Sequence, residues 1–122
     1  MSEENAPQAE PEEKEFIDAA MKIIMPAGDA RNQAAASLDA MLAGDGQKAA
    51  ELLREANASI LEAHHVQTGL IQKEARREME TGTSTHIPLF FIHAQDTLMT
   101  IMSEVKLVES MERMYQAIKG AE

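Results

Sequence analysis

The chain of 122 residues has no cysteine, and its basic residues are few. Without cysteine it can form no disulfide, thiolate zinc site, iron–sulfur cluster or cysteine nucleophile. Lysine and arginine total 11 against 21 acidic residues, which gives a formal net charge of −10. A surface of this charge repels phosphate, so nucleic acid and anionic lipid are excluded as the main partners.

Long apolar runs are also missing. No stretch reaches the roughly 18 residues that a membrane-spanning helix needs. The N-terminus is acidic and lacks the basic and then apolar order of a secretory signal. We therefore expect a cytoplasmic protein. Its length suits one small domain with a modest core, because such a chain buries only about two-thirds of its unfolded surface.

The composition predicts the fold class. Aromatic residues make up 3% of the chain, and valine occurs only at Val66, Val105 and Val108. β-branched and aromatic side chains are thus too scarce to build a sheet. Alanine, methionine, glutamate and leucine, which favour helices, are plentiful. We predict an all-α protein.

The first 13 residues differ from the rest. They contain two prolines and five glutamates, and no large apolar side chain follows Met1. Such a segment cannot bury enough surface to offset the entropy lost on ordering. We expect residues 1–13 to form a disordered acidic tail, followed by one domain over residues 14–122.

Apolar spacing predicts three helices, at about residues 14–43, 47–79 and 88–119. Glycines at 44 and 46 end the first helix, and the polar residues 80–85 read as a loop. Pro26 should kink the first helix because its ring displaces the carbonyl four residues back. Three helices of about 30 residues, each roughly 45 Å long, should form an antiparallel up-down-up bundle.

The third helix is apolar almost all round between Leu89 and Met102, whereas an ordinary surface helix is apolar on one side only. A three-helix bundle can cover only part of such a helix, so the sequence predicts self-association. The apolar residues are Leu89, Phe90, Phe91, Ile92, Ala94, Leu98, Met99, Ile101 and Met102.

Polar residues interrupt these apolar surfaces. His93 and Asp96 are three residues apart and share one face of the third helix, and Gln95 lies between them. Gln67 lies on the inward row of the second helix, and His64 lies on the row beside it. A bundle could bring Gln95, Gln67 and His64 toward His93. The alternative is a buried His93–Asp96 pair that only sets register, with the other polar groups satisfied in the core.

The sequence lacks the motifs of several other kinds of functional site. The chain has no Gly-rich phosphate loop and no GxGxxG or GxSxG motif. Glu62 and His65 form one Glu-x-x-His motif, but di-iron bundles need two on separate helices. Thr83 and Phe90 stand where a second glutamate would precede His86 and His93.

Several segments resemble the IIA component of the lactose/cellobiose-type sugar phosphotransferase system, over roughly residues 14–119. The second helix and the third helix resemble the family's helices in the same order, and so does the Ala27-Gly28 segment of the first. The matching segments are His93-Ala-Gln-Asp96, Leu98-Met99-Thr100, Glu55-Ala56, Ala63-His64, Gln67-Thr68, Leu70-Ile71-Gln72, Glu74-Ala75 and Ala27-Gly28 with Ala30-Arg31.

The resemblance implies a three-helix subunit that assembles as a homotrimer. His93 would accept a phosphoryl group from the histidine-containing phosphocarrier protein. It would pass the group to a cysteine of the IIB component, which acts with the IIC membrane component in sugar uptake. Gln95, Gln67 and His64 are candidate supporting donors. Asp96 would lie on the trimer axis, where three carboxylates would either bind a cation such as Mg²⁺ or need another way to reduce their mutual repulsion. The phosphoryl transfer itself would need no cofactor.

Two positions depart from the family pattern. Thr97 stands where the family often has a second histidine, which changes the local electrostatics but leaves His93 in place. Pro26 lies in a helix that usually has no proline there. Two alternatives stay open: a non-catalytic structural oligomer, in which His93 and Asp96 only hold register, and a regulatory paralogue on the same scaffold.

Overall fold

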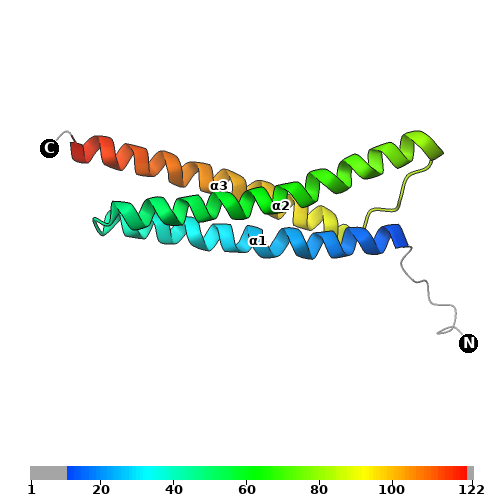
Figure 1. The fold of residues 1–122 in the computed structure, drawn as a ribbon, viewed down its shortest axis with the longest axis horizontal. Helices are drawn as coiled ribbons and strands as arrows, with labels where there is room; N and C mark the ends of the chain where they lie inside the picture. The colour runs from blue at the N-terminus through cyan, green and yellow to red at the C-terminus, as the bar shows by residue number, and fades with distance from the viewer. Residues whose placement is uncertain (1–10, 121–122) are drawn as a thin grey trace, which may run out of the picture.

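The computed structural model describes residues 11–120, which form three α helices: α1 (Pro11–Leu42), α2 (Gly46–Thr81) and α3 (Leu89–Gly120). α1 and α3 run in the same direction and α2 runs opposite to both (Figure 1). The described residues contain no strand. The predicted all-α, up-down-up arrangement is confirmed.

The N-terminal boundary differs from the sequence expectation, because α1 begins at Pro11. The expected tail therefore divides: residues 1–10 lie outside the described part of the chain, and residues 11–13 are helical. The first helical position tolerates proline, since its N–H would have no intrahelical partner. Glu12 and Glu13 lie in the first turn, where negative charge favours the helix dipole.

Pro26 does not end α1, which is continuous from Pro11 to Leu42. Pro26 is buried, and Ile23, Ala27 and Ala30 around it are each 0% exposed. Packing on both sides of the proline thus holds the helix together despite the lost backbone hydrogen bond.

The connections use local turn chemistry. Asp45 is the N-cap of α2, and its side chain accepts a hydrogen bond from the Lys48 backbone N–H at 3.1 Å. Gly82 is the C-cap of α2 and lies in the left-handed region, with φ 74°; its N–H donates to the Glu78 carbonyl at 2.8 Å. This conformation suits glycine because it has no Cβ.

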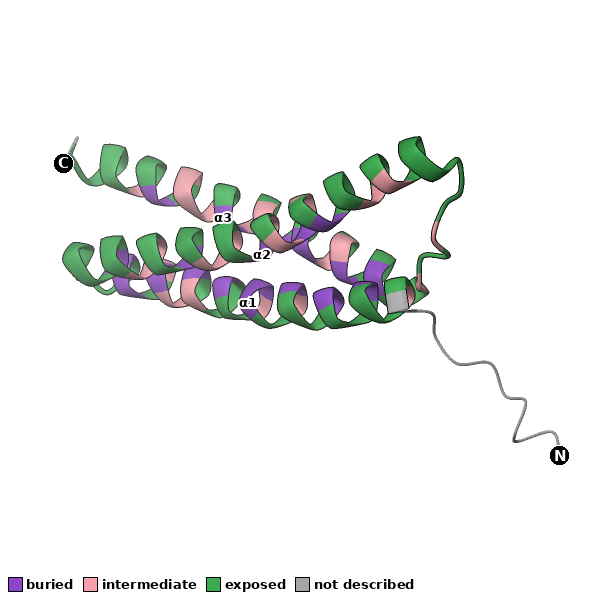
Figure 2. Cartoon of the chain, turned by 45° about the vertical axis from the view of Figure 1, so that its right-hand side comes forward, coloured by how far each residue is buried: buried purple, intermediate pink, exposed green. Residues whose placement is uncertain are grey.

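α1 is the central helix of the core, since it packs against both α2 and α3, whereas α2 and α3 contact each other much less. Buried residues follow this shared surface (Figure 2). Phe16 of α1 meets Phe91 of α3 edge to face, with ring centroids 4.9 Å apart. The main core consists of Phe16, Ala19, Ala20, Ile23, Ala27, Ala30, Ala34, Ala56, Ala63, Leu70, Phe91, Ala94, Leu98, Ile101 and Val105.

The last turns of α2 are more exposed than the sequence pattern predicted. Leu70 and Ile71 continue the apolar spacing that predicts the second helix, but Ile71 is 43% exposed, and Met79 near the end of α2 is 86% exposed. Figure 1 shows the reason: this end of α2 diverges from α1. The apolar periodicity continues here, although α1 no longer covers this end of α2 within residues 11–120 (Figure 1).

The outer face of α3 is apolar and open in one subunit. The inner residues Phe91, Leu98 and Ile101 are buried, which confirms that one bundle covers only part of this helix. The exposed apolar residues of α3 are Leu89, Phe90, Ile92, Met99, Leu107, Met111, Met114 and Ile118. In residues 11–120, none of the helices has the length and apolarity that crossing a membrane requires.

Candidate functional site

His93 is exposed on the second turn of α3. The inner side of this turn is fixed by Phe91, which is 2% exposed, and by Ala94, which is fully buried. The histidine is thus held outward on a rigid element. Asp96 is exposed as well. A buried His93–Asp96 pair, one of the two sequence interpretations, is therefore wrong for the single subunit, because the inner residues of α3 occupy the core.

Within residues 11–120, the side-chain hydrogen bonding at His93 involves only its backbone carbonyl. The Thr97 hydroxyl donates to the His93 carbonyl oxygen at 2.9 Å, within the same helix. Within the described part of the chain, neither imidazole nitrogen has a hydrogen-bond or ion-pair partner. The ring is accessible to a group that another molecule brings to it.

Gln95 lies on another side of α3, because two residues correspond to about 200° around a helix. It lines a groove of about 340 Å³ between α2 and the start of α3, together with Phe91 and Ile92. His93 is not part of this groove. One subunit therefore does not place Gln95 beside the His93 ring.

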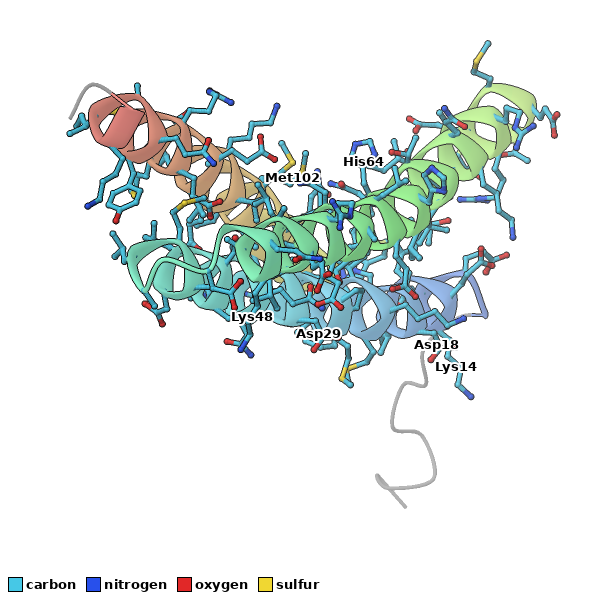
Figure 3. All side chains as sticks on the ribbon, turned by 60° about the vertical axis from the view of Figure 1, so that its left-hand side comes forward. Lys14, Asp18, Asp29, Lys48, His64 and Met102 are labelled. Carbon is cyan, nitrogen blue, oxygen red and sulfur yellow. The ribbon has the colours of Figure 1, made fainter. Side chains whose placement is uncertain are left out.

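The two candidate residues of α2 differ in burial. Gln67 is 5% exposed, as expected for the inward row. His64 is half-buried, and its Nδ1 lies 3.5 Å from the Thr68 hydroxyl. Figure 3 shows the His64 side chain on the side of α2 away from α1. No hydrogen bond between described residues joins either side chain to His93, so their supporting role stays a prediction.

Residues 11–120 contain no group of three or more His, Cys, Asp or Glu side chains that could hold a metal ion within one chain. A site made of three Asp96 carboxylates would need three subunits. The proposed Mg²⁺ site therefore stays a prediction.

The loop before α3 is held by a polar cluster that the sequence analysis missed. The Glu74 carboxylate accepts hydrogen bonds from Arg77 Nε at 3.1 Å and Nη2 at 3.0 Å. It also accepts from the Thr85 backbone N–H at 2.6 Å and the Thr85 hydroxyl at 3.0 Å, and Arg77 Nη2 contacts that hydroxyl as well. Hydrogen bonding from Arg77, and then from Thr85, lowers the pKa of Glu74 to about 2. The three-residue spacing of Glu74 and Arg77 was the available signal, but the partner in the loop was not visible.

The fold and the exposed histidine define a class: a three-helix subunit with an exposed histidine on its third helix. Residues 18–116 match the lactose/cellobiose-specific IIA subunit of the phosphotransferase system. The chain belongs to this family.

Named relatives agree in sequence and structure. The lactose-specific EIIA component of Lacticaseibacillus casei is 41% identical over 100 residues, covering 82% of this chain and 85% of the relative. The N,N'-diacetylchitobiose-specific EIIA component of Escherichia coli (strain K12) is 30% identical, covering 98% of this chain and 99% of the relative. The crystal structure of the cellobiose-specific enzyme IIA of Bacillus anthracis superposes with a TM-score of 0.75 at 33% identity, covering 95% of this chain and 97% of that one.

Proposed function

We propose that this chain is a phosphocarrier and that His93 is its covalent centre. His93 accepts a phosphoryl group from the histidine-containing phosphocarrier protein and passes it to a cysteine of the cognate IIB component. IIB acts with the IIC membrane component in the uptake of a lactose/cellobiose-type disaccharide. The observation that carries the proposal is the exposed His93 in the His93-Ala-Gln-Asp96 segment of a family member.

The chemistry suits an exposed imidazole. A neutral ring nitrogen of His93 attacks the phosphorus of the donor phosphohistidine; the new N–P bond forms as the donor N–P bond breaks, and the donor imidazole leaves. In the second step a cysteine thiolate takes the group and His93 is the leaving group. Histidine is suited to both roles because its neutral form is populated near pH 7. Each reaction partner is a protein side chain, so an open surface serves better than a closed pocket.

Charge on the transferring group must be stabilised by hydrogen-bond donors. Gln95, Gln67 and His64 are the candidate donors, although one subunit holds none of them in hydrogen-bond contact with His93. We propose assembly as a homotrimer through the exposed apolar face of α3, with Asp96 near the axis. Three carboxylates gathered there either bind a cation such as Mg²⁺ or share protons.

Replacing His93 tests the centre. His93→Gln should abolish phosphate incorporation from phosphoenolpyruvate, enzyme I and the phosphocarrier protein, because the glutamine amide is not a nucleophile. The wild type should gain about 80 Da by mass spectrometry, the mass of one phosphoryl group in place of a proton. His65→Gln is the matched control, because His65 is exposed on α2, and it should be phosphorylated as the wild type is.

Phosphate on the His93→Gln variant would refute the assignment and direct attention to His64. No phosphate on the wild type would favour a structural helical oligomer. Phosphorylation of the wild type without transfer to any IIB protein would favour a regulatory paralogue.

A further inference from the structure

Sulfur in this chain occurs only in methionine, since the sequence has nine methionines and no cysteine. The methionines differ widely in exposure. Met41 is buried, with 6% of its surface exposed. Met99, Met111 and Met114 of α3 are 51%, 47% and 64% exposed, respectively. Exposure determines which sulfur atoms an oxidant in solution can reach, so these three methionines of α3 are accessible in one subunit.

The three methionines share the outer face of α3. At about 100° per residue, Met99, Met111 and Met114 fall within about 120° of one another around the helix axis. Leu107 lies inside the same sector and is 58% exposed, whereas Leu98 lies on the opposite side and is buried. The three sulfur atoms are thus part of the apolar surface through which the homotrimer is proposed to form.

We propose, on the basis of that homotrimer, that Met99, Met111 and Met114 form an oxidation site that controls assembly. The oxidant is a hydroperoxide, with hydrogen peroxide as the simplest case. A sulfur lone pair attacks one peroxide oxygen, and the S–O bond forms as the O–O bond breaks. The leaving hydroxide takes the remaining proton and becomes water. Each sulfur is oxidised by two electrons to the sulfoxide, and each peroxide is reduced.

The sulfoxide is incompatible with a covered apolar face. It is strongly polar, whereas the thioether that it replaces is apolar. Leu107 and Ile118, one helical turn from Met111 and Met114 respectively, have no polar side-chain group to pair with it. Burial of an unpaired polar group costs free energy. Oxidation should therefore favour separated subunits, and assembly should in turn slow oxidation, because a second copy covers the sulfur atoms.

α1 supplies matched controls for this effect. Met25 and Met114 are each 64% exposed, and Met21 and Met111 are each 47% exposed. Neither α1 methionine lies on the outer face of α3. Because the two members of each pair are equally exposed in one subunit, a difference in their oxidation rates reports what covers α3 in solution.

Peptide mass spectrometry of the full chain in hydrogen peroxide tests the protection. Each sulfoxide adds about 16 Da, the mass of one oxygen atom. In an assembled sample Met114 should oxidise severalfold more slowly than Met25, and Met111 more slowly than Met21. Dilution below the concentration of assembly should remove both differences, and Met41 should stay unoxidised throughout. Equal rates within both pairs in the assembled sample would overturn the inference.

Light scattering over a dilution series tests the effect on assembly. The oxidised wild type should dissociate at a concentration about tenfold or more above that of the untreated chain. Methionine sulfoxide reductase with dithiothreitol should restore assembly; this reaction forms a disulfide in the dithiol and releases water. An oxidised chain that stays as fully assembled as the untreated chain would overturn the inference while leaving the proposed homotrimer intact.

Two sets of substitutions locate the responsible sulfur atoms. The combined variant Met99→Leu, Met111→Leu and Met114→Leu keeps the apolar face at similar volume, so it should stay assembled in peroxide. The control Met21→Leu with Met25→Leu should dissociate as the wild type does, and the reverse result would overturn the inference. Should the triple variant fail to assemble, the reductase experiment on the wild type decides: reassembly supports the inference, and continued dissociation overturns it. Neither readout needs phosphorylation of His93, so failure of the proposed carrier role would be a separate result.

Discussion

Single residues in this protein act mainly by holding segments together. Glu74 fixes Thr85 of the loop before α3, and Phe91 fixes the first turn of α3 against Phe16. Together they determine where α3 starts and so where His93 lies. Neither contact involves the imidazole, so substitutions here should change stability before they change the chemistry of phosphoryl transfer.

Acid should weaken the loop anchor. The pKa of Glu74 is about 2, below the ordinary 4.5, because Arg77 and Thr85 donate hydrogen bonds to its charged form. Its stabilising contribution is present above the ordinary value and is lost as pH falls toward about 2. Glu74→Gln should therefore melt at a lower temperature than the wild type at pH 7, and the difference should shrink as pH falls toward about 2.

The measurement is a set of thermal melts followed by circular dichroism. Glu62→Gln, an exposed position on the same helix, is the control and should follow the wild type throughout. If the melting temperature of Glu74→Gln stays below that of the wild type by the same amount down to the lowest pH, the proposed role of ionised Glu74 in holding the loop is wrong.

At the level of elements, the sequence predicted the helices well and their surroundings less well. Apolar spacing and the glycines at 44 and 46 placed the helices within a few residues, because these signals are local. The exposure of Ile71 was not predictable, since it depends on where α2 diverges from α1. The Glu74–Thr85 and Ser37–Glu112 contacts were also invisible, because each joins residues that only the fold brings together.

The candidate site was also predictable only in part, because some of its signals are local in the sequence and others depend on the fold. The resemblance of its segment singled out His93 as the candidate, which stays a prediction, and the helix pattern correctly placed it on the third helix. Its exposure was not foreseen, because the apolar residues around it suggested burial. Helical geometry separates Gln95 from His93, and one subunit does not show what faces the ring in an assembly.

Two glycines allow a matched test of element stability. Gly82 has φ 74° at the end of α2, whereas Gly69 is inside that helix and has open space where an added Cβ would lie. Gly82→Ala should destabilise the fold by about 1 kcal/mol through left-handed strain. Gly69→Ala should stabilise it by roughly 0.5–1 kcal/mol, because alanine favours a helix.

Urea unfolding of the three proteins under the same conditions would measure these differences. Each substitution adds one methyl group, Gly69→Ala inside α2 and Gly82→Ala directly after it. Opposite signs of the change in the free energy of unfolding would therefore isolate backbone conformation as the cause. Equal effects of the two substitutions would show that Gly82 is not needed for the left-handed turn.

At the level of the whole molecule, one apolar side of the bundle is left uncovered. α1 packs against both other helices, and the outer face of α3 is left exposed with Leu89, Met99 and Leu107 on it. Apolar surface of this extent favours association. A homotrimer joined through this face would cover it.

Leu107→Glu should disrupt that assembly, because it places a charge on the exposed apolar face. Leu107 is 58% exposed in one subunit, and Leu42, at the end of α1, is 57% exposed. Light scattering at micromolar concentration should give three chain masses for the wild type and for the control Leu42→Glu, and a smaller mass for Leu107→Glu.

A monomeric wild type would exclude the trimer. Equal dissociation by the two substitutions would show that the outer face of α3 is not the interface.

The odd number of helices has a practical consequence for handling this protein. α1 starts and α3 ends at opposite ends of the bundle (Figure 1), and α3 starts toward the end where α1 starts. An affinity tag or fluorophore joined before α1 would therefore sit on the same end as His93 and would obstruct an approaching protein. One joined beyond Gly120 would be separated from His93 by about 40 Å of helix. Assays of phosphoryl transfer should use the C-terminal attachment.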